Sequence, residues 1–288
     1  MNFETYLKER VAPSTAKRYL REIELFFLSA EEKNMDPVTA TYQQIMDYLG
    51  ELRNKTKSKR INCSLHGIKK YYTYLIATGQ RKGHPCRYIK LRDKQGRDIQ
   101  LQDLFKPTEL EQLLEKKERY KLLKNRNQIV ISLFIYQGLT NGEVTNLQLD
   151  AINLEQGTIR ILPGRKTNAR TLKLQSKQVF WIMNYLQEDR PRLLKTESKK
   201  LIISSRGTEE TGEGICYIIE TQRYLFPTRK LNAKTIRQSV ITNLLKEGKD
   251  LRIVQAFAGH KYPSTTEKYK QTQVEELKNQ ILKYHPLK

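Results

Sequence analysis

The chain has 288 residues and a mass of 33.9 kDa, with 53 Lys and Arg residues against 31 Asp and Glu residues, which gives a formal net charge of +22. The hydrophobic content of 38% fits a globular chain of about two domains and excludes a disordered or fibrous one. No apolar run approaches the roughly 20 residues of a membrane span, and the first ten residues lack the apolar region of a signal peptide, so we expect a soluble, cytoplasmic protein.

The N-terminal part of the chain has the pattern of a small helical domain, which we take as residues 1–90. Apolar residues recur there at helical spacing, and Ser14, directly after a proline, is the expected N-cap of the second helix. Further helices are predicted to begin near Thr41 and Ser58. A polar stretch with almost nothing to bury follows, and the linker is therefore placed at 91–105.

The second domain, residues 106–288, is predicted to contain both helices and strands. Thr108 and Glu111 have the spacing of a capping box, in which side chain and backbone satisfy each other's open hydrogen bonds. A buried helix is expected over 129–136. The hydrophobic period then changes to that of short strands joined by turns, expected at 152–161 and 170–174.

Helices are predicted again from Asn232 onward, with Gly248 and Gly259 at their ends. The glycine-containing segment 205–215 is interpreted as a flexible loop. An amphipathic C-terminal helix is predicted from apolar residues at helical spacing, namely Val274, Leu277, Ile281 and Leu282. The predicted fold class is therefore mainly α with a small β-sheet.

The cysteines and histidines do not form a set of metal ligands. Cys63, Cys86 and Cys216 lie far apart, which argues against a disulfide framework and leaves no CxxC pair for zinc. Only His84 and Cys86 bring two ligand types close together, and two ligands do not make a closed site. We expect neither a metal nor any other cofactor.

The positive charge is concentrated in residues 51–100, which hold 14 basic and 3 acidic side chains. A basic run leads there into Tyr71, Tyr72 and Tyr74, so that cations stand beside flat rings, as in a surface that binds nucleic acid. A solvated helix face is the alternative interpretation. The DNA-binding residues predicted in this stretch are Lys55, Lys57, Lys59, Arg60, Lys69 and Lys70.

Several motifs follow one another in the remainder of the chain. The stretch Lys234-Thr-Ile-Arg237 is followed by the pair Gly259-His260, and Tyr269 stands nine residues beyond that histidine. Upstream lie the segments Gln137-Gly-Leu-Thr-Asn-Gly-Glu143 and Arg165-Lys166-Thr167. The ordered set resembles the tyrosine recombinase (phage integrase) family, in its Xer and integrase-like form. The motifs that match are the family's H-x-x-R pair, GH turn, tyrosine, TGLRxxEL helix start and hairpin lysine. The resemblance covers nearly the whole chain.

The resemblance implies a DNA strand-exchange enzyme with a helical core-binding domain and an α/β catalytic domain. Tyr269 would attack a DNA phosphodiester, release a 5′-hydroxyl and form a 3′-phosphotyrosyl bond without ATP or metal. Arg237 would bind the non-bridging phosphate oxygens, and His260 would hydrogen-bond the phosphate or accept the tyrosyl proton. Lys166, on a mobile hairpin tip, would protonate the leaving oxygen, and Glu143 would orient its neighbours.

Two positions depart from the family pattern. Thr140 stands where the family has its first arginine, and Lys234 stands in place of the histidine of H-x-x-R. Loss of a charged donor at a transition-state oxygen typically slows a reaction by ~10²–10³-fold. Arg165, Arg170 and Lys234 are the candidate replacements, and we expect Lys234 or Arg165 to fill the role.

The resemblance also implies the partners. The first partner is double-stranded DNA, with Arg165 as a further contact. The second is the protein itself, as a homo-tetramer on two DNA sites in which the C-terminal helix docks on the adjacent protomer. An accessory DNA-bending or directionality protein is also compatible with the resemblance. The protein would then be associated with the nucleoid. Two alternatives remain open at this point: a recombinase-fold protein that binds DNA without cleaving it, and a sequence-specific regulator in which Tyr269 is structural.

Overall fold

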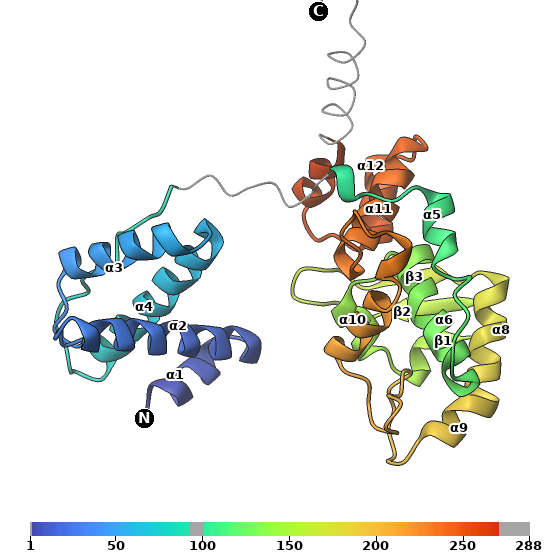
Figure 1. The fold of residues 1–288 in the computed structure, drawn as a ribbon, viewed down its shortest axis with the longest axis horizontal. Coiled ribbons are helices and arrows are strands. Elements are labelled where there is room, and N and C mark those ends of the chain that lie inside the picture. The colour runs from blue at the N-terminus through green and yellow to red at the C-terminus, as the bar shows by residue number, and fades with distance from the viewer. Residues whose placement is uncertain (1, 93–100, 271–288) are drawn as a thin grey trace, which may run out of the picture. The chain divides into compact units, whose positions relative to one another are not determined.

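The structure, a computed structural model, describes residues 2–92 and 101–270, and these two ranges form two compact units (Figure 1). Both units are mainly helical, and the second also holds a three-stranded sheet, so the predicted fold class is confirmed. Within the described residues, no helix combines the length and the apolar character needed to cross a bilayer.

The first unit consists of four helices around one apolar core. They are α1 (Phe3–Arg10), α2 (Pro13–Glu32), α3 (Tyr42–Lys55) and α4 (Ser58–Ala77). Helix α4 packs against the other three, because its apolar residues recur every three or four positions and so lie on one face. The buried residues of that face include Ile61, Leu65, Ile68, Tyr72 and Leu75.

Two expectations for the first unit were wrong. The N-cap of α2 is Ala12, because Pro13, whose fixed φ and missing N–H suit the first turn, begins the helix and places Ser14 inside it. The three rings after the basic run are interior: Tyr71, Tyr72 and Tyr74 are 8%, 0% and 8% exposed. They pack in the hydrophobic core, so they do not form a surface beside the cations.

The second unit contains the remaining helices and the sheet. Its α-helices are α5 (Pro107–Gln112), α6 (Lys121–Tyr136), α7 (Asn141–Asn146), α8 (Ser176–Asn184), α9 (Arg190–Leu193), α10 (Gly212–Glu220), α11 (Ala233–Lys246) and α12 (Leu251–Ala258). Its strands are β1 (Ile152–Asn153), β2 (Thr158–Ile161) and β3 (Arg170–Lys173). Short 3₁₀ turns lie at Leu101–Asp103, Leu149–Ala151 and Arg223–Leu225, and a π-helical turn, Tyr185–Asp189, joins α8 to α9.

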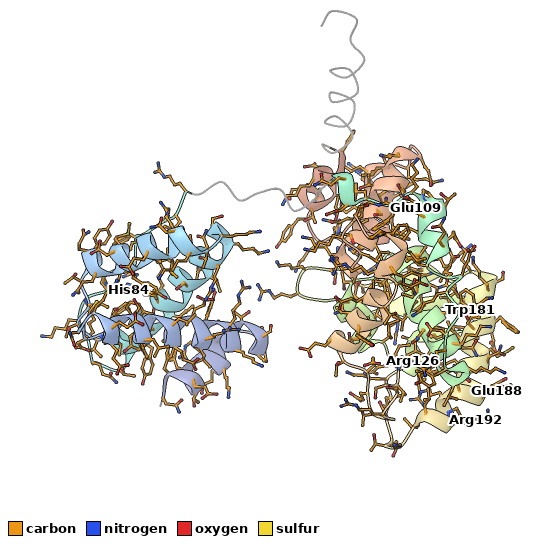
Figure 2. All side chains as sticks on the ribbon, in the orientation of Figure 1. His84, Glu109, Arg126, Trp181, Glu188 and Arg192 are labelled. Carbon is orange, nitrogen blue, oxygen red and sulfur yellow. The ribbon has the colours of Figure 1, made fainter. Side chains whose placement is uncertain are left out.

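Helix α6 is the centre of the second unit and packs against α8, α10 and α11. Its residues from Ile129 to Ile135 are all buried. Arg126, labelled in Figure 2, is also buried, and it is tolerated there because its guanidinium pairs with Glu210 at 3.2 Å and donates to the Ile203 carbonyl. The sheet is antiparallel in the order β1-β2-β3, with Ile159 paired to both Ile152 and Leu172.

Four details differ from the sequence predictions for this unit. Helix α5 begins at Pro107, so Glu109 rather than Glu111 accepts a hydrogen bond from the Lys106 N–H, at 2.8 Å. The segment 205–215 is not all loop, because Thr211 caps α10 and the helix starts at Gly212. Phe105, assigned to the linker, is 1% exposed in the core of the second unit. The continuous helical stretch from α8 to α9 is the fourth difference, since the sequence pattern does not predict it. The predicted C-terminal helix lies outside the described residues.

Candidate active site

Arg237 is held in the interior between two other segments of the second unit. Asn232 caps α11 by accepting from the Thr235 N–H at 3.0 Å, and Arg237 follows in the second turn. Its guanidinium donates from Nη1 to the carbonyl of Gly138 and from Nη2 to the carbonyl of Ala258, the latter at 2.7 Å. These bonds fix the direction of the charged group, and Arg237 is buried.

Glu143 connects Arg237 to a second arginine. Thr140 caps α7, and the Glu143 carboxylate reaches back to accept from the Thr140 N–H at 2.8 Å. The same carboxylate forms a two-pronged ion pair with Arg170 of β3, at 2.7 and 3.2 Å, and lies 3.9 Å from Nη1 of Arg237. Burial alone would raise the pKa of Glu143, but the hydrogen bonds and charge of Arg170 outweigh it and hold this pKa below its usual value.

His260 follows directly where α12 ends. Gly259 has φ +67°, which closes the helix in the left-handed region and turns the chain. The His260 ring is buried, with Nδ1 2.8 Å from the hydroxyl of Thr266. Burial, reinforced by Arg237 and Arg170, lowers the pKa of His260 to about 4, so the imidazole is neutral at pH 7.

Tyr269 lies beside His260. It belongs to the helical residues 263–270, and its ring is stacked on that of His260, with an interplanar angle of 13° and 6.1 Å between ring centroids. The Tyr269 ring is 8% exposed and packs with Ile241, Val254 and Ala258. The tyrosine, the histidine and the Arg237 guanidinium therefore converge on the end of α12.

The hairpin between β2 and β3 is joined to the same place. Gly164 N–H donates to the Thr167 carbonyl at 3.0 Å, which makes a tight turn with Arg165 and Lys166 at its two central positions. Thr167 forms an antiparallel bridge with His260, and the backbone N–H of Asn168 donates to the Gly259 carbonyl at 2.8 Å. The expected mobile tip is thus connected by backbone contacts to the segment that carries the histidine.

Of the residues predicted for the site, the structure brings Arg237, His260, Tyr269, Glu143 and Thr140 together. Lys166 and Arg165 are exposed in the adjoining turn, and Lys234 is exposed on α11 one turn before Arg237. From the sequence, Arg170 is only one of three candidate replacements for the missing arginine. A cation on a four-residue strand normally faces solvent, so the sequence did not indicate that the side chain of Arg170 is only 6% exposed.

The predicted DNA-binding residues of the first unit have different surroundings. The exposed ones stand at the end of α3 and the start of α4, and they are Lys55, Lys57 and Lys59. Arg60 pairs with Glu22 at 3.3 Å, and the ammonium of Lys69 donates to the Ile89 carbonyl at 2.6 Å. Lys70 is half-buried.

Comparison with protein families gives a match to the phage integrase family over residues 104–276, which includes every residue of this cluster. Tyrosine recombinase XerD of Lacticaseibacillus casei is 25% identical to this chain, and the match covers 96% of this chain and 94% of that protein. Tyrosine recombinase XerC of Oceanobacillus iheyensis is 26% identical, and the match covers 97% of this chain and 92% of that protein.

Solved structures share the fold at lower identity. XerH site-specific recombinase bound to a palindromic difH substrate has a TM-score of 0.68 and 22% identity, and the match covers 92% of this chain and 78% of that one. A lambda integrase dimer bound to a core site has a TM-score of 0.67 and 13% identity, and the match covers 93% of this chain and 92% of that one.

Proposed function

Because the chain belongs to the phage integrase family and is therefore a site-specific tyrosine recombinase that exchanges DNA strands, we propose that Tyr269 is its nucleophile and that Arg237, His260 and Lys166 serve the reaction. The Tyr269 oxygen forms a bond to a DNA phosphorus atom, and the bond from phosphorus to the 5′-oxygen breaks. The product is a 3′-phosphotyrosyl bond and a free 5′-hydroxyl, and the reverse reaction rejoins a strand.

The observation that carries this assignment is the convergence of three groups on the end of α12. The guanidinium of Arg237 is bound to Ala258, His260 follows two residues later, and the ring of Tyr269 stacks on that histidine. A tyrosine of ordinary pKa, near 10, is a weak nucleophile at pH 7, so a fixed cation beside the phosphate is needed to stabilise the developing charge. Arg237 is such a cation, because two carbonyl groups hold it.

Two proton transfers complete the reaction. His260 is neutral at pH 7, and its Nδ1 is occupied by Thr266, so Nε2 remains to hydrogen-bond the phosphate or to take the proton that Tyr269 loses. The leaving 5′-oxygen must gain a proton, and the exposed ammonium of Lys166 in the hairpin turn is the proposed donor.

The assembly proposed here is the one that the family resemblance suggests. A helical DNA-binding domain (1–90), a linker (91–105) and a catalytic domain (106–288) act together on double-stranded DNA. Four copies act on two DNA sites, in the cytoplasm at the nucleoid. The relatives named above include recombinases solved with DNA, and the exposed Lys55, Lys57 and Lys59 supply positive charge for phosphate contacts.

The test is covalent trapping. The purified protein is incubated with a library of nicked duplexes that carry a random central region, the mixture is denatured in SDS, and DNA that remains attached to the protein is sequenced. A nick beside the cleaved phosphate lets the short 5′-hydroxyl strand diffuse away, so the adduct accumulates. We expect the wild-type protein to yield an enriched sequence, which then serves as the defined substrate.

Tyr269→Phe should bind that substrate with unchanged affinity and form no adduct, since only the attacking oxygen is lost. Tyr262→Phe is the matched control: Tyr262 is 62% exposed seven residues earlier, and its variant should react normally. DNA binding without any adduct from the wild-type protein would instead favour a recombinase-fold protein that does not cleave. An adduct that survives Tyr269→Phe would show that another residue is the nucleophile.

A further inference from the structure

The candidate site lacks one cation that the family pattern leads us to expect. Thr140 occupies the position of the family's first arginine, and its side chain is engaged in capping α7 and in a hydrogen bond to Glu143 at 3.0 Å. Lys234 and Arg165, the two replacements favoured from the sequence, are both exposed. Arg170 is the remaining candidate, and its surroundings differ from theirs.

Arg170 reaches from β3 into the cluster that holds Arg237. Its guanidinium binds the same carboxylate, Glu143, that lies 3.9 Å from Arg237. It also lies against Gly259, where a Cβ atom would collide with the guanidinium, so the glycine is required for this approach as well as for the turn. The two arginines therefore share one carboxylate as an ion-pair partner, with Arg237 at the longer distance, and lie against one short segment, 258–260.

The hydrogen bonds of Arg170 leave donors unused. A guanidinium has five N–H groups, and Glu143 accepts from one on each Nη atom. Within the described residues, the Nε atom of Arg170 is buried and has no hydrogen-bond partner. An unpartnered buried donor is unfavourable, and an acceptor that arrives with a ligand would satisfy it.

The charge of the cluster also calls for an anion. The side chains of Arg170, Glu143 and Arg237 are 6%, 9% and 9% exposed, and they carry two positive charges and one negative charge. His260, being neutral, does not change this balance. A phosphodiester group carries one negative charge and can accept several hydrogen bonds, so it matches both the excess charge and the unused donors.

We propose that Arg170 is the second arginine of the phosphate-binding site. It contacts the scissile phosphate together with Arg237 and replaces the family's first arginine, whose position Thr140 occupies. This inference rests on the proposed function. Arg170 donates to a non-bridging oxygen through the N–H groups that Glu143 leaves free. Glu143 keeps the Arg170 guanidinium in position, and the Gly138 and Ala258 carbonyls keep that of Arg237 in position.

The first test compares two substrates of the trapped sequence, one with an ordinary scissile phosphate and one with a methylphosphonate, in which a neutral methyl group replaces a charged oxygen. Arg170→Ala should slow single-turnover cleavage of the phosphate by ~10²–10³-fold. The loss should shrink to less than about tenfold on the methylphosphonate, because less charge develops there. Lys173→Ala, which removes an exposed cation from the same strand, is the matched control and should react at the wild-type rate.

Two results would overturn the proposal. One is Arg170→Ala cleaving the phosphate within about threefold of the wild-type rate. The other is an equal loss on both substrates, since a purely structural role would not distinguish a charged phosphate from a neutral one.

The second test restores the family arginine. A pocket lined in part by Thr140, Glu143, Gly164 and Thr167 leaves room for a longer side chain. Thr140→Arg alone should gain no rate, because Arg170 already fills the role and two like charges would compete. In the Arg170→Ala background it should recover at least about tenfold. A gain in the wild-type background with none in the Arg170→Ala background would contradict the proposal.

A third measurement does not require cleavage. In protein labelled with ¹⁵N-arginine, the Nε–H signals of Arg170 and Arg237 are assigned from Arg170→Lys and Arg237→Lys, and inorganic phosphate is titrated against chloride at constant ionic strength. Both signals should shift along one saturation curve. A shift of the Arg237 signal alone would reject Arg170 as a phosphate ligand. This outcome is distinct from the failure of the wild-type protein to form an adduct, which would count against the proposed function instead.

Discussion

His260 shows how the surroundings of one residue set its chemistry. The ring is 6% exposed and has two arginines nearby, so protonation is opposed both by the loss of hydration and by like charge. The same arrangement that keeps the imidazole neutral at pH 7 therefore makes it hard to charge. In the unfolded chain, where the ring is hydrated, the pKa returns to about 6.5.

This difference predicts how stability depends on pH. Between pH 6.5 and 4 the unfolded chain binds a proton at His260 and the folded chain does not, so the free energy of unfolding should fall as the pH decreases, by up to about 3 kcal/mol. Above pH 6.5 this contribution is constant. Trp181, the single tryptophan, packs on the core of the second unit, and its fluorescence in urea titrations at several pH values measures the effect.

His260→Gln should remove most of that pH dependence, since glutamine does not titrate. His66→Gln is the matched control, because His66 is exposed on α4 in the first unit. If the stability of His260→Gln fell as steeply as that of the wild-type protein between pH 6.5 and 4.5, the buried neutral imidazole would not be the source of the effect.

Elements whose ends are set by local chemistry could be predicted from the sequence. Thr41 and Asn232 cap α3 and α11 where expected, because the hydroxyl or amide oxygen satisfies a free N–H three residues on. The short strands were found from their alternation, and Ile159 and Ile161 are indeed buried. Thr108 failed as a cap because Pro107 begins the helix one residue earlier.

Features that depend on contacts distant in sequence could not be predicted. Tyr72 continues the apolar series of α4, but Tyr71 lies beside that series, and its burial depends on α1 and α2, whose Phe3 and Phe27 pack on it. For the candidate site, motif spacing selected Arg237, His260 and Tyr269 together. The role of Glu143 as a shared acceptor depends on β3 folding back over 27 residues to bring Arg170 against it.

The hairpin between β2 and β3 carries its own prediction. Lys166→Ala should slow cleavage of the trapped sequence, because the leaving 5′-oxygen loses its proton donor. A substrate with a 5′-bridging sulfur should restore most of the rate, since a thiolate leaves without protonation. Single-turnover adduct formation on both substrates measures this.

Arg165→Ala, at the neighbouring exposed position of the same turn, should not be rescued by the sulfur substrate, because a phosphate-contacting arginine does not act on the leaving group. Lack of rescue for Lys166→Ala as well would assign Lys166 to DNA binding.

For the molecule as a whole, the net charge of +22 predicts strongly salt-dependent binding to duplex DNA. Each phosphate contact releases counterions, so affinity should fall by about 10³-fold or more between 50 and 200 mM salt if six or more contacts form. Replacing Lys55, Lys57 and Lys59 with alanine should reduce the slope of log K against log salt by up to about 2.7, roughly 0.9 per contact, as measured by fluorescence anisotropy.

Lys8→Ala with Lys33→Ala is the matched control in the same unit, because these exposed lysines already pair with Glu4 and Glu51. The double variant should keep the wild-type slope. An unchanged slope for the triple variant would mean that the cations at the junction of α3 and α4 are only solvated.

The backbone contacts that join the hairpin to Gly259 and His260 limit which changes evolution can tolerate there. Surface turns usually accept insertions and deletions freely. In this turn, the bridge between Thr167 and His260 sets the register, so one added residue before Thr167 would displace Lys166 by about 3.3 Å and turn its side chain to the opposite face. The identities of the exposed Leu162 and Pro163 are therefore free to drift among related chains, while the number of residues between Ile161 and Thr167 should stay constant.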